Sequence, residues 1–228
     1  MKILCTPFLL LLTTITLAQN FTGSFDLVMT QESASGNMRQ DTISYYFAET
    51  KTAIIIRAKG NQPDLRLVFV PSDSTITGLF EMNEKKGGYI LPMNDKYWPG
   101  MQYALRDFGT GPRMKLNDTE SKETINGIFC HEMKCESEKY DVSLYIAPEI
   151  ELSLVQVLAY QSVGAGEDTE AVDMLNACGV QGFAMRSIVS DKKRDATITL
   201  AIQNMSSEVP ERIFSVEGYS ISDMRKKN

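Results

Sequence analysis

The chain has 228 residues, of which 43% are hydrophobic and 23% charged, and its formal net charge is −6 at pH 7. This length suffices for one sizeable core, and neither a repeat nor a shift in composition divides the chain. The acidic balance argues against non-specific nucleic-acid binding, which needs clustered lysine and arginine.

Residues 1–18 have the parts of a secretory signal. Lys2 supplies the positive charge, an apolar segment follows, and Thr16-Leu17-Ala18 has small residues where a signal peptidase cleaves. The alternative, an uncleaved anchor, would need the ~20 apolar residues that span a bilayer, and the segment is shorter. We therefore expect a mature chain of residues 19–228 that forms one secreted or periplasmic domain, with no transmembrane segment.

The N-terminal half reads as a series of short strands separated by polar turns. Ile43, Tyr45 and Phe47 alternate with less apolar neighbours, which is typical of a strand with one buried face. Six strands at this spacing predict an antiparallel meander. We place them at residues 21–30, 43–48, 52–58, 65–70, 75–82 and 89–92, with a tight polar turn at 84–88.

Residues 95–117 are irregular, with a helical turn expected at 101–107. We interpret this stretch as a lid or loop over the sheet, and the alternative is an ordinary surface connection. The next stretch, 123–148, is the clearest β-hairpin pattern of the chain. Its second arm alternates from Tyr140 to Ile146 and ends at Pro148, and residues 136–139 suit the turn.

Two helices are expected after the hairpin. The first covers residues 150–161, although Ile150, Leu152 and Leu154 also fit a strand, and the second is capped by Asp168 or Thr169 and ended by Gly179. The apolar face of the second helix is formed by Ala171, Met174, Leu175 and Cys178. Strands are then predicted at 180–190 and 196–203, and a last edge strand at 214–221.

Three cysteines remain in the expected mature chain. Cys130 and Cys135 lie on one strand with opposite facing, at roughly 16 Å, which is too far apart for a disulfide. Cys178 lies on the inward helix face and could reach either one, and Cys135 shares the apolar strand face. We prefer a Cys135–Cys178 bridge, which an oxidising compartment permits. Three unpaired thiols are the open alternative.

Catalytic and metal-binding patterns are weak. Cys130 and His131 are neighbours on a strand and point to opposite faces, so they do not suit a Cys–His catalytic pair. The spacing of Cys130, His131, Cys135 and Cys178 is not that of a zinc site. The carboxylates are scattered, and the phosphate-loop and nucleophile-elbow motifs are missing. We expect no enzymatic activity, no metal and no cofactor.

The order of these features resembles a known family. The segment from Thr124 to Met133, the strand from Tyr140 to Pro148 and the ending Phe214-Ser215-Val216-Glu217-Gly218-Tyr219 are similar to an uncharacterised family of secreted, Bacteroidetes-type proteins. That family is similar in fold to the LolA/LolB lipoprotein carriers. The resemblance implies an α+β fold: a strongly curved antiparallel β-sheet, an open half-barrel, with two or three helices packed on the concave face.

The fold that this resemblance implies leaves an apolar cleft, which the chain's own helices or a ligand must fill. The methionine content favours an adaptable apolar surface, and ordinary core filling is the alternative. The methionines include Met29, Met82, Met93, Met101, Met114, Met133, Met174 and Met185. We hypothesise that the cleft is lined by Phe47, Phe69, Phe80, Phe129, Met133, Leu144 and Met185.

The leading hypothesis is a binding or carrier protein for a lipid or another hydrophobic ligand. The alternative is a structural or protein-interaction module of the cell envelope whose cleft is plugged by its own helices, with the last edge strand free to pair with a partner. The sequence names neither the ligand nor the oligomeric state.

Overall fold

The computed structural model describes residues 21–58, 60, 62–106, 116–164, 166 and 169–225, and the predicted export signal lies outside them. The described strands form one sheet in the order β12-β6-β5-β4-β3-β2-β1-β11-β10-β9-β8-β7. Their bounds are β1 Gly23–Glu32, β2 Met38–Phe47, β3 Thr52–Ile56, β4 Leu65–Val70, β5 Thr75–Met82, β6 Lys85–Pro92, β7 Asn117–Ile125, β8 Ile128–Glu136, β9 Tyr140–Ala147, β10 Phe183–Asp191, β11 Ala196–Ser206 and β12 Ser220–Asp223.

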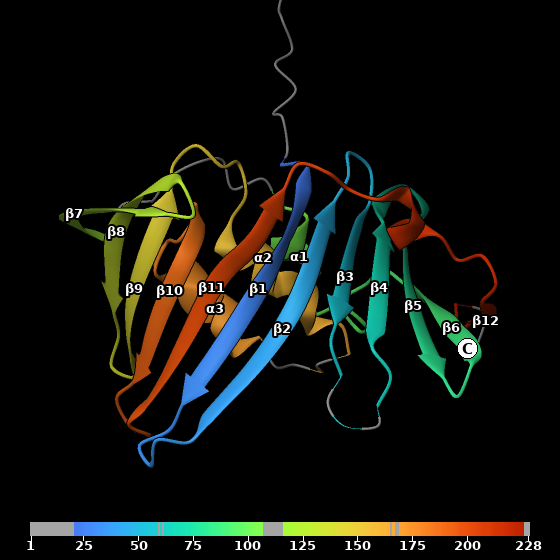
Figure 1. The fold of residues 1–228 in the computed structure, drawn as a ribbon, viewed down its shortest axis with the longest axis horizontal. Coiled ribbons are helices and arrows are strands. Elements are labelled where there is room, and N and C mark those ends of the chain that lie inside the picture. Colours follow the sequence, from blue (N-terminus) through green and yellow to red (C-terminus); the bar gives the residue numbers. More distant parts are fainter. Residues whose placement is uncertain are drawn as a thin grey trace, which may run out of the picture.

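The sheet consists of two antiparallel meanders joined at its centre. Strands β1 to β6 pair in chain order, as the sequence predicted, and β7 to β11 do the same. The first strand of one meander pairs with the last of the other, so that Met29 on β1 lies opposite Leu200 on β11. Strands β7 and β12 lie at opposite ends of the curved sheet (Figure 1), which therefore stays open.

The helices of the described chain gather against one face of the sheet (Figure 1). They are α1 Met101–Ala104, α2 Leu154–Ala159 and α3 Glu170–Ala177, and the shorter 3₁₀ turns are η1 Pro71–Asp73, η2 Tyr160–Ser162 and η3 Glu211–Phe214. The fold is α+β, an open curved sheet with helices packed on its concave face, and the predicted fold class is confirmed.

Trp98 holds the helices to the sheet. Its side chain is fully buried, and its ring centroid lies 4.6 Å from that of Phe69 on β4 and 5.3 Å from that of Tyr160. The indole N–H donates to the Ala159 carbonyl at 2.8 Å. Residues 95–117, which the sequence suggested as a lid or an ordinary loop, thus contain a central core residue. Residues 107–115 of this segment lie outside the described chain.

The hairpin predicted at residues 123–148 needs one correction. Strands β8 and β9 form its two arms, but residues 123–125 belong to β7. A tight turn at Asn126 and Gly127 separates β7 from β8, and both residues have positive φ, 51° and 81°. Asn-Gly is the preferred pair for this turn because neither residue resists the left-handed conformation strongly. The single long first arm of the prediction was therefore wrong.

A second correction concerns the turn predicted at residues 84–88. Strand β6 begins at Lys85, and the turn consists of Asn83 and Glu84, with φ of 51° and 63°. Lys85 and Lys86 pair with Met82 and Glu81 of β5. Their polarity follows from their position near an exposed hairpin tip, where a polar strand residue needs no buried partner.

The C-terminal segment also differs from the predicted strand at 214–221. Phe214 ends η3 and is buried on the outer face of the sheet with Ala53, Val68 and Leu79. Arg66 holds this segment in place, because its guanidinium donates to the carbonyls of residues 212 and 215 at 3.2 and 3.0 Å. Within this C-terminal segment, only β12 is a strand, and it pairs in parallel with β6.

Candidate functional site

A mostly apolar pocket of about 440 Å³ lies between the concave face and the helices. It is lined by Met29, Tyr140, Leu158, Gln161, Ser162, Thr169, Glu170, Ala171, Val172, Met174, Leu175, Val189, Arg194, Ile198 and Leu200. The polar members lie at helix ends and beside strand turns, whereas the apolar ones come from strand interiors and helix faces.

The sheet wall of this pocket follows from the pairing of three strands. Leu200 on β11 lies opposite Met29 on β1, and Ile198 on β11 lies opposite Val189 on β10. Leu200 and Ile198 are two residues apart, so both point to the same face of the sheet. Four apolar side chains therefore form a continuous surface.

The helix wall is formed by Leu158 on α2 and by Val172, Met174 and Leu175 on α3. Helix α2 is buried along nearly its whole length, and its Ser153 cap accepts a hydrogen bond from the Val155 amide at 3.2 Å. The predicted apolar face of the second helix is confirmed in part, since residues 171, 174 and 175 all line the pocket.

Helix α3 is fixed to the sheet at both ends. A disulfide joins Cys178, just after the helix, to Cys135 on β8, which is the preferred pairing of the sequence. At the other end, Glu170 accepts hydrogen bonds from Lys139 and from the Tyr140 hydroxyl, the latter at 2.9 Å. The Lys139 ammonium holds the pKa of Glu170 below its usual value. The pair is therefore intact at neutral pH and is lost as the pH falls through that lowered pKa.

A buried hydrogen-bond chain meets the pocket at Gln161. The Tyr45 hydroxyl donates to the Val157 carbonyl at 3.0 Å and accepts from the Gln161 side-chain amide at 2.7 Å. Burial raises the pKa of Tyr45 far above its ordinary value, so this phenol remains a neutral donor. No sequence pattern pointed to this arrangement, because its members are far apart along the chain.

Most of the side chains predicted to line a cleft are buried in the core between sheet and helices. These are Phe47, Phe69, Met133, Leu144 and Met185. Phe47 also contributes to a second pocket of about 500 Å³, together with Tyr160 and Lys51.

The other two predicted residues, Phe80 and Phe129, lie nearer the surface. Phe80 is partly buried and lines an edge pocket of about 500 Å³ near Met82 and Ser220. Phe129 is 43% exposed and packs against the His131 ring at 4.9 Å. The pocket of about 440 Å³ is lined by a different set of residues.

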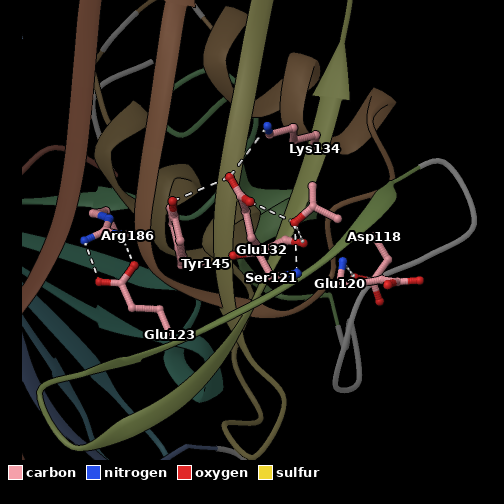
Figure 2. Close-up of polar contacts among 9 residues, drawn as sticks. Asp118, Glu120, Ser121, Glu123, Glu132, Lys134, Tyr145 and Arg186 are labelled. Carbon is pink, nitrogen blue, oxygen red and sulfur yellow. Dashed lines mark hydrogen bonds and ion pairs between the residues drawn. The ribbon is translucent and has the colours of Figure 1, made fainter.

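The outer face carries a polar network that holds β7 against the sheet (Figure 2). Arg186 on β10 pairs with both carboxylate oxygens of Glu123 on β7, and its guanidinium lies 4.0 Å from the centroid of the Tyr145 ring. Glu132 accepts from Thr119 at 2.8 Å. Because each of these charges has a partner, we interpret the network as structural.

The thiol considered for catalysis lies in an environment that disfavours its reactive form. Cys130 is buried as a free thiol, and burial raises its pKa, which disfavours the reactive thiolate. Among the described residues, no group of three or more His, Cys, Asp or Glu side chains is placed to hold a metal ion. Within the same residues, no helix is long and apolar enough to cross a membrane.

Comparison with known proteins gives a family but no activity. The family model described as "Domain of unknown function (DUF4412)" matches residues 21–218. No curated protein sequence gave a significant match.

Among similar solved structures, PNGF-II has 8% identity and a TM-score of 0.42, over 90% of this chain and 32% of that one. The chain thus spans about a third of the length of PNGF-II. A LolA superfamily protein from Nitrosomonas europaea has 10% identity and a TM-score of 0.34, over 87% and 91% of the two chains. MucB, solved in complex with MucA(peri), has 9% identity and a TM-score of 0.39, over 85% and 54%.

Proposed function

The chain belongs to the DUF4412 family, a domain of unknown function, and from that premise we propose that it is an exported binding or carrier protein for a hydrophobic ligand. The pocket between the concave face and the helices is the observation that carries this proposal. Its volume falls within the roughly 300–1,000 Å³ of small-molecule sites, and such sites are mostly apolar with a few polar groups.

The pocket chemistry suits a flexible apolar chain. Met29 and Met174 stand on opposite walls, one on the sheet and one on α3. Methionine side chains adapt to irregular apolar shapes, and each buried methylene of a ligand contributes ~0.8 kcal/mol. A ligand would enter where α3 meets the sheet, beside the Lys139–Glu170 pair.

Filling the pocket should weaken ligand binding strongly. Ile198→Trp adds a large ring to the sheet wall, and we expect it to weaken binding of the fluorescent probe Nile red at least tenfold, measured by fluorescence titration. The matched control is Thr199→Trp, which places the same ring on the opposite face of β11 and should bind normally. If both variants lost the same Nile red affinity, or if neither lost any, the assignment of this pocket would be contradicted.

Export provides a separate prediction. If residues 1–18 are a cleaved signal, N-terminal sequencing of the protein recovered from outside the cytoplasm should begin at Gln19. Full-length protein with an intact Met1 in that fraction would contradict cleavage.

One observation favours the second candidate, a protein-interaction module. The chain's own helices already fill much of the concave face, since Phe69, Leu144 and Met185 are buried beneath them. In this case β7 or β12, at the ends of the sheet, would pair with a partner protein. A stoichiometric protein partner in pull-downs, together with no uptake of any apolar probe, would favour this function over the carrier.

A further inference from the structure

The polar side chains that line the pocket differ in what they leave open to a ligand. The Ser162 hydroxyl donates to the Ala159 carbonyl at 2.9 Å and accepts from the Gly100 amide at 2.8 Å. The Thr169 hydroxyl donates to Asp173 at 2.6 Å, and Tyr140 donates to Glu170. The protons of these three hydroxyls are therefore already committed to groups of the protein.

Gln161 is different, because its hydrogen bond to Tyr45 fixes which end of its side-chain amide faces the pocket. Tyr45 is fully buried and its hydroxyl hydrogen goes to the Val157 carbonyl, so the phenol oxygen has only lone pairs to offer Gln161. The side-chain NH₂ of Gln161 must therefore face Tyr45, at 2.7 Å. Its carbonyl oxygen accepts no hydrogen bond from the described residues, and the side chain lines the pocket.

The charges around the pocket do not supply a deep site for an anion. Lys139 is paired with Glu170. Arg194 is 78% exposed and its guanidinium lies 3.8 Å from Asp191, so it stays at the rim in water. A carboxylate brought beside Gln161 would meet an acceptor oxygen and lose its hydration without gaining a partner.

We propose that the pocket takes an uncharged amphiphile, with its apolar chain between Leu158, Leu175 and Leu200 and with a hydroxyl or amide N–H that donates to Gln161. This inference rests on the proposed function and names the ligand class for the same site. Gln161 is then the residue that determines specificity, because it selects ligands that carry a donor over ligands that carry only acceptors.

Three ligands with the same chain test this proposal by displacement of Nile red from the wild-type protein. Dodecanol carries a donor, methyl dodecanoate is uncharged without a donor, and dodecanoate is charged without one at neutral pH. One neutral hydrogen bond corresponds to about a fivefold difference, so dodecanol should bind about fivefold more tightly than the ester. Dodecanoate should bind more weakly than either.

The variant Gln161→Met keeps the length of the side chain but removes both the acceptor oxygen and the NH₂ that donates to Tyr45. It should abolish the preference for dodecanol over the ester, whereas the control Gln203→Met, at an exposed position of β11, should keep the preference. If Gln161→Met fails to fold, the alcohol-to-ester ratio on the wild-type protein decides alone.

The remaining outcomes separate the two proposals. Equal affinity for alcohol and ester, tightest binding of dodecanoate, or a preference that survives in Gln161→Met would overturn the role of Gln161 and leave the carrier function standing. Failure of all three ligands to displace the probe, or to bind by calorimetry, would overturn the carrier function itself.

Discussion

Replacing both Cys135 and Cys178 by alanine should lower the free energy of unfolding by about 4 kcal/mol. The two residues are 43 positions apart, and their bond restricts the unfolded chain over that whole loop. Both cysteines are buried, so the loss of their packing adds to the effect. Urea unfolding followed by far-ultraviolet circular dichroism measures the difference.

Cys130→Ala is the matched control for the disulfide variant. It removes a buried sulfur from the same strand, β8, without touching the disulfide, and should cost about 1 kcal/mol. A double variant that unfolds at the same urea concentration as this control would show that the disulfide contributes little. Because α3 forms one wall of the pocket, the double variant should also release Nile red faster.

Trp98→Ala should cost about 3–5 kcal/mol, as large-to-small changes of buried aromatic residues do. The side chain is fully buried, packs against Phe69 and Tyr160, and donates to the Ala159 carbonyl. Its loss leaves a cavity between the sheet and α2. Circular dichroism must follow the unfolding, because Trp98 is the single tryptophan of the chain and the variant has no indole fluorescence.

Trp98→Phe separates packing from hydrogen bonding at this position. It keeps a ring against Phe69 but cannot donate to the Ala159 carbonyl. That carbonyl still accepts from the Ser162 hydroxyl, so it is not left unsatisfied and the cost should be about 1–2 kcal/mol. If the alanine and phenylalanine variants were equally unstable, the hydrogen bond rather than the packing of the ring would be the main contribution of Trp98.

Strands that alternate, or that are bounded by clear turn residues, were predictable from sequence. Residues 65–70 and 75–82 have the predicted bounds, and the strand predicted at 196–203 is the core of β11. The alternation in residues 196–203 reflects one face against the helices and one toward solvent, whereas β4 and β5 are short β-forming runs that bury side chains on both faces. The family match likewise confirms the resemblance to an uncharacterised family.

Strand β7 was not predicted, because its residues give no apolar alternation. It is a polar edge strand, and most of its side chains are exposed. What places it is the turn at Asn126 and Gly127 and the pairing of Glu123 with Arg186, across 63 positions of sequence. The Asn-Gly signal was present in the sequence and would have located the turn.

The pocket was the hardest part to predict. Large side chains on strand faces, such as Leu144 and Met185, are the ones that helices cover most completely, so they form the core. The pocket lies where the helix cover is incomplete, and that depends on how α3 is tied to β8. Of the residues that line the pocket, Met29 and Met174 were singled out from the sequence because the chain is rich in methionine.

The contact between β1 and β11 has a consequence for the order of events during biogenesis. The sheet's central pair joins residues 175 positions apart in the sequence, Leu27 and Ile202. Contacts that span most of a sequence form slowly, because a long loop must close first. We expect the emerging polypeptide to remain without its central pair until β11 has been synthesised, and, if the chain is exported as proposed, this delay keeps it threadable during translocation.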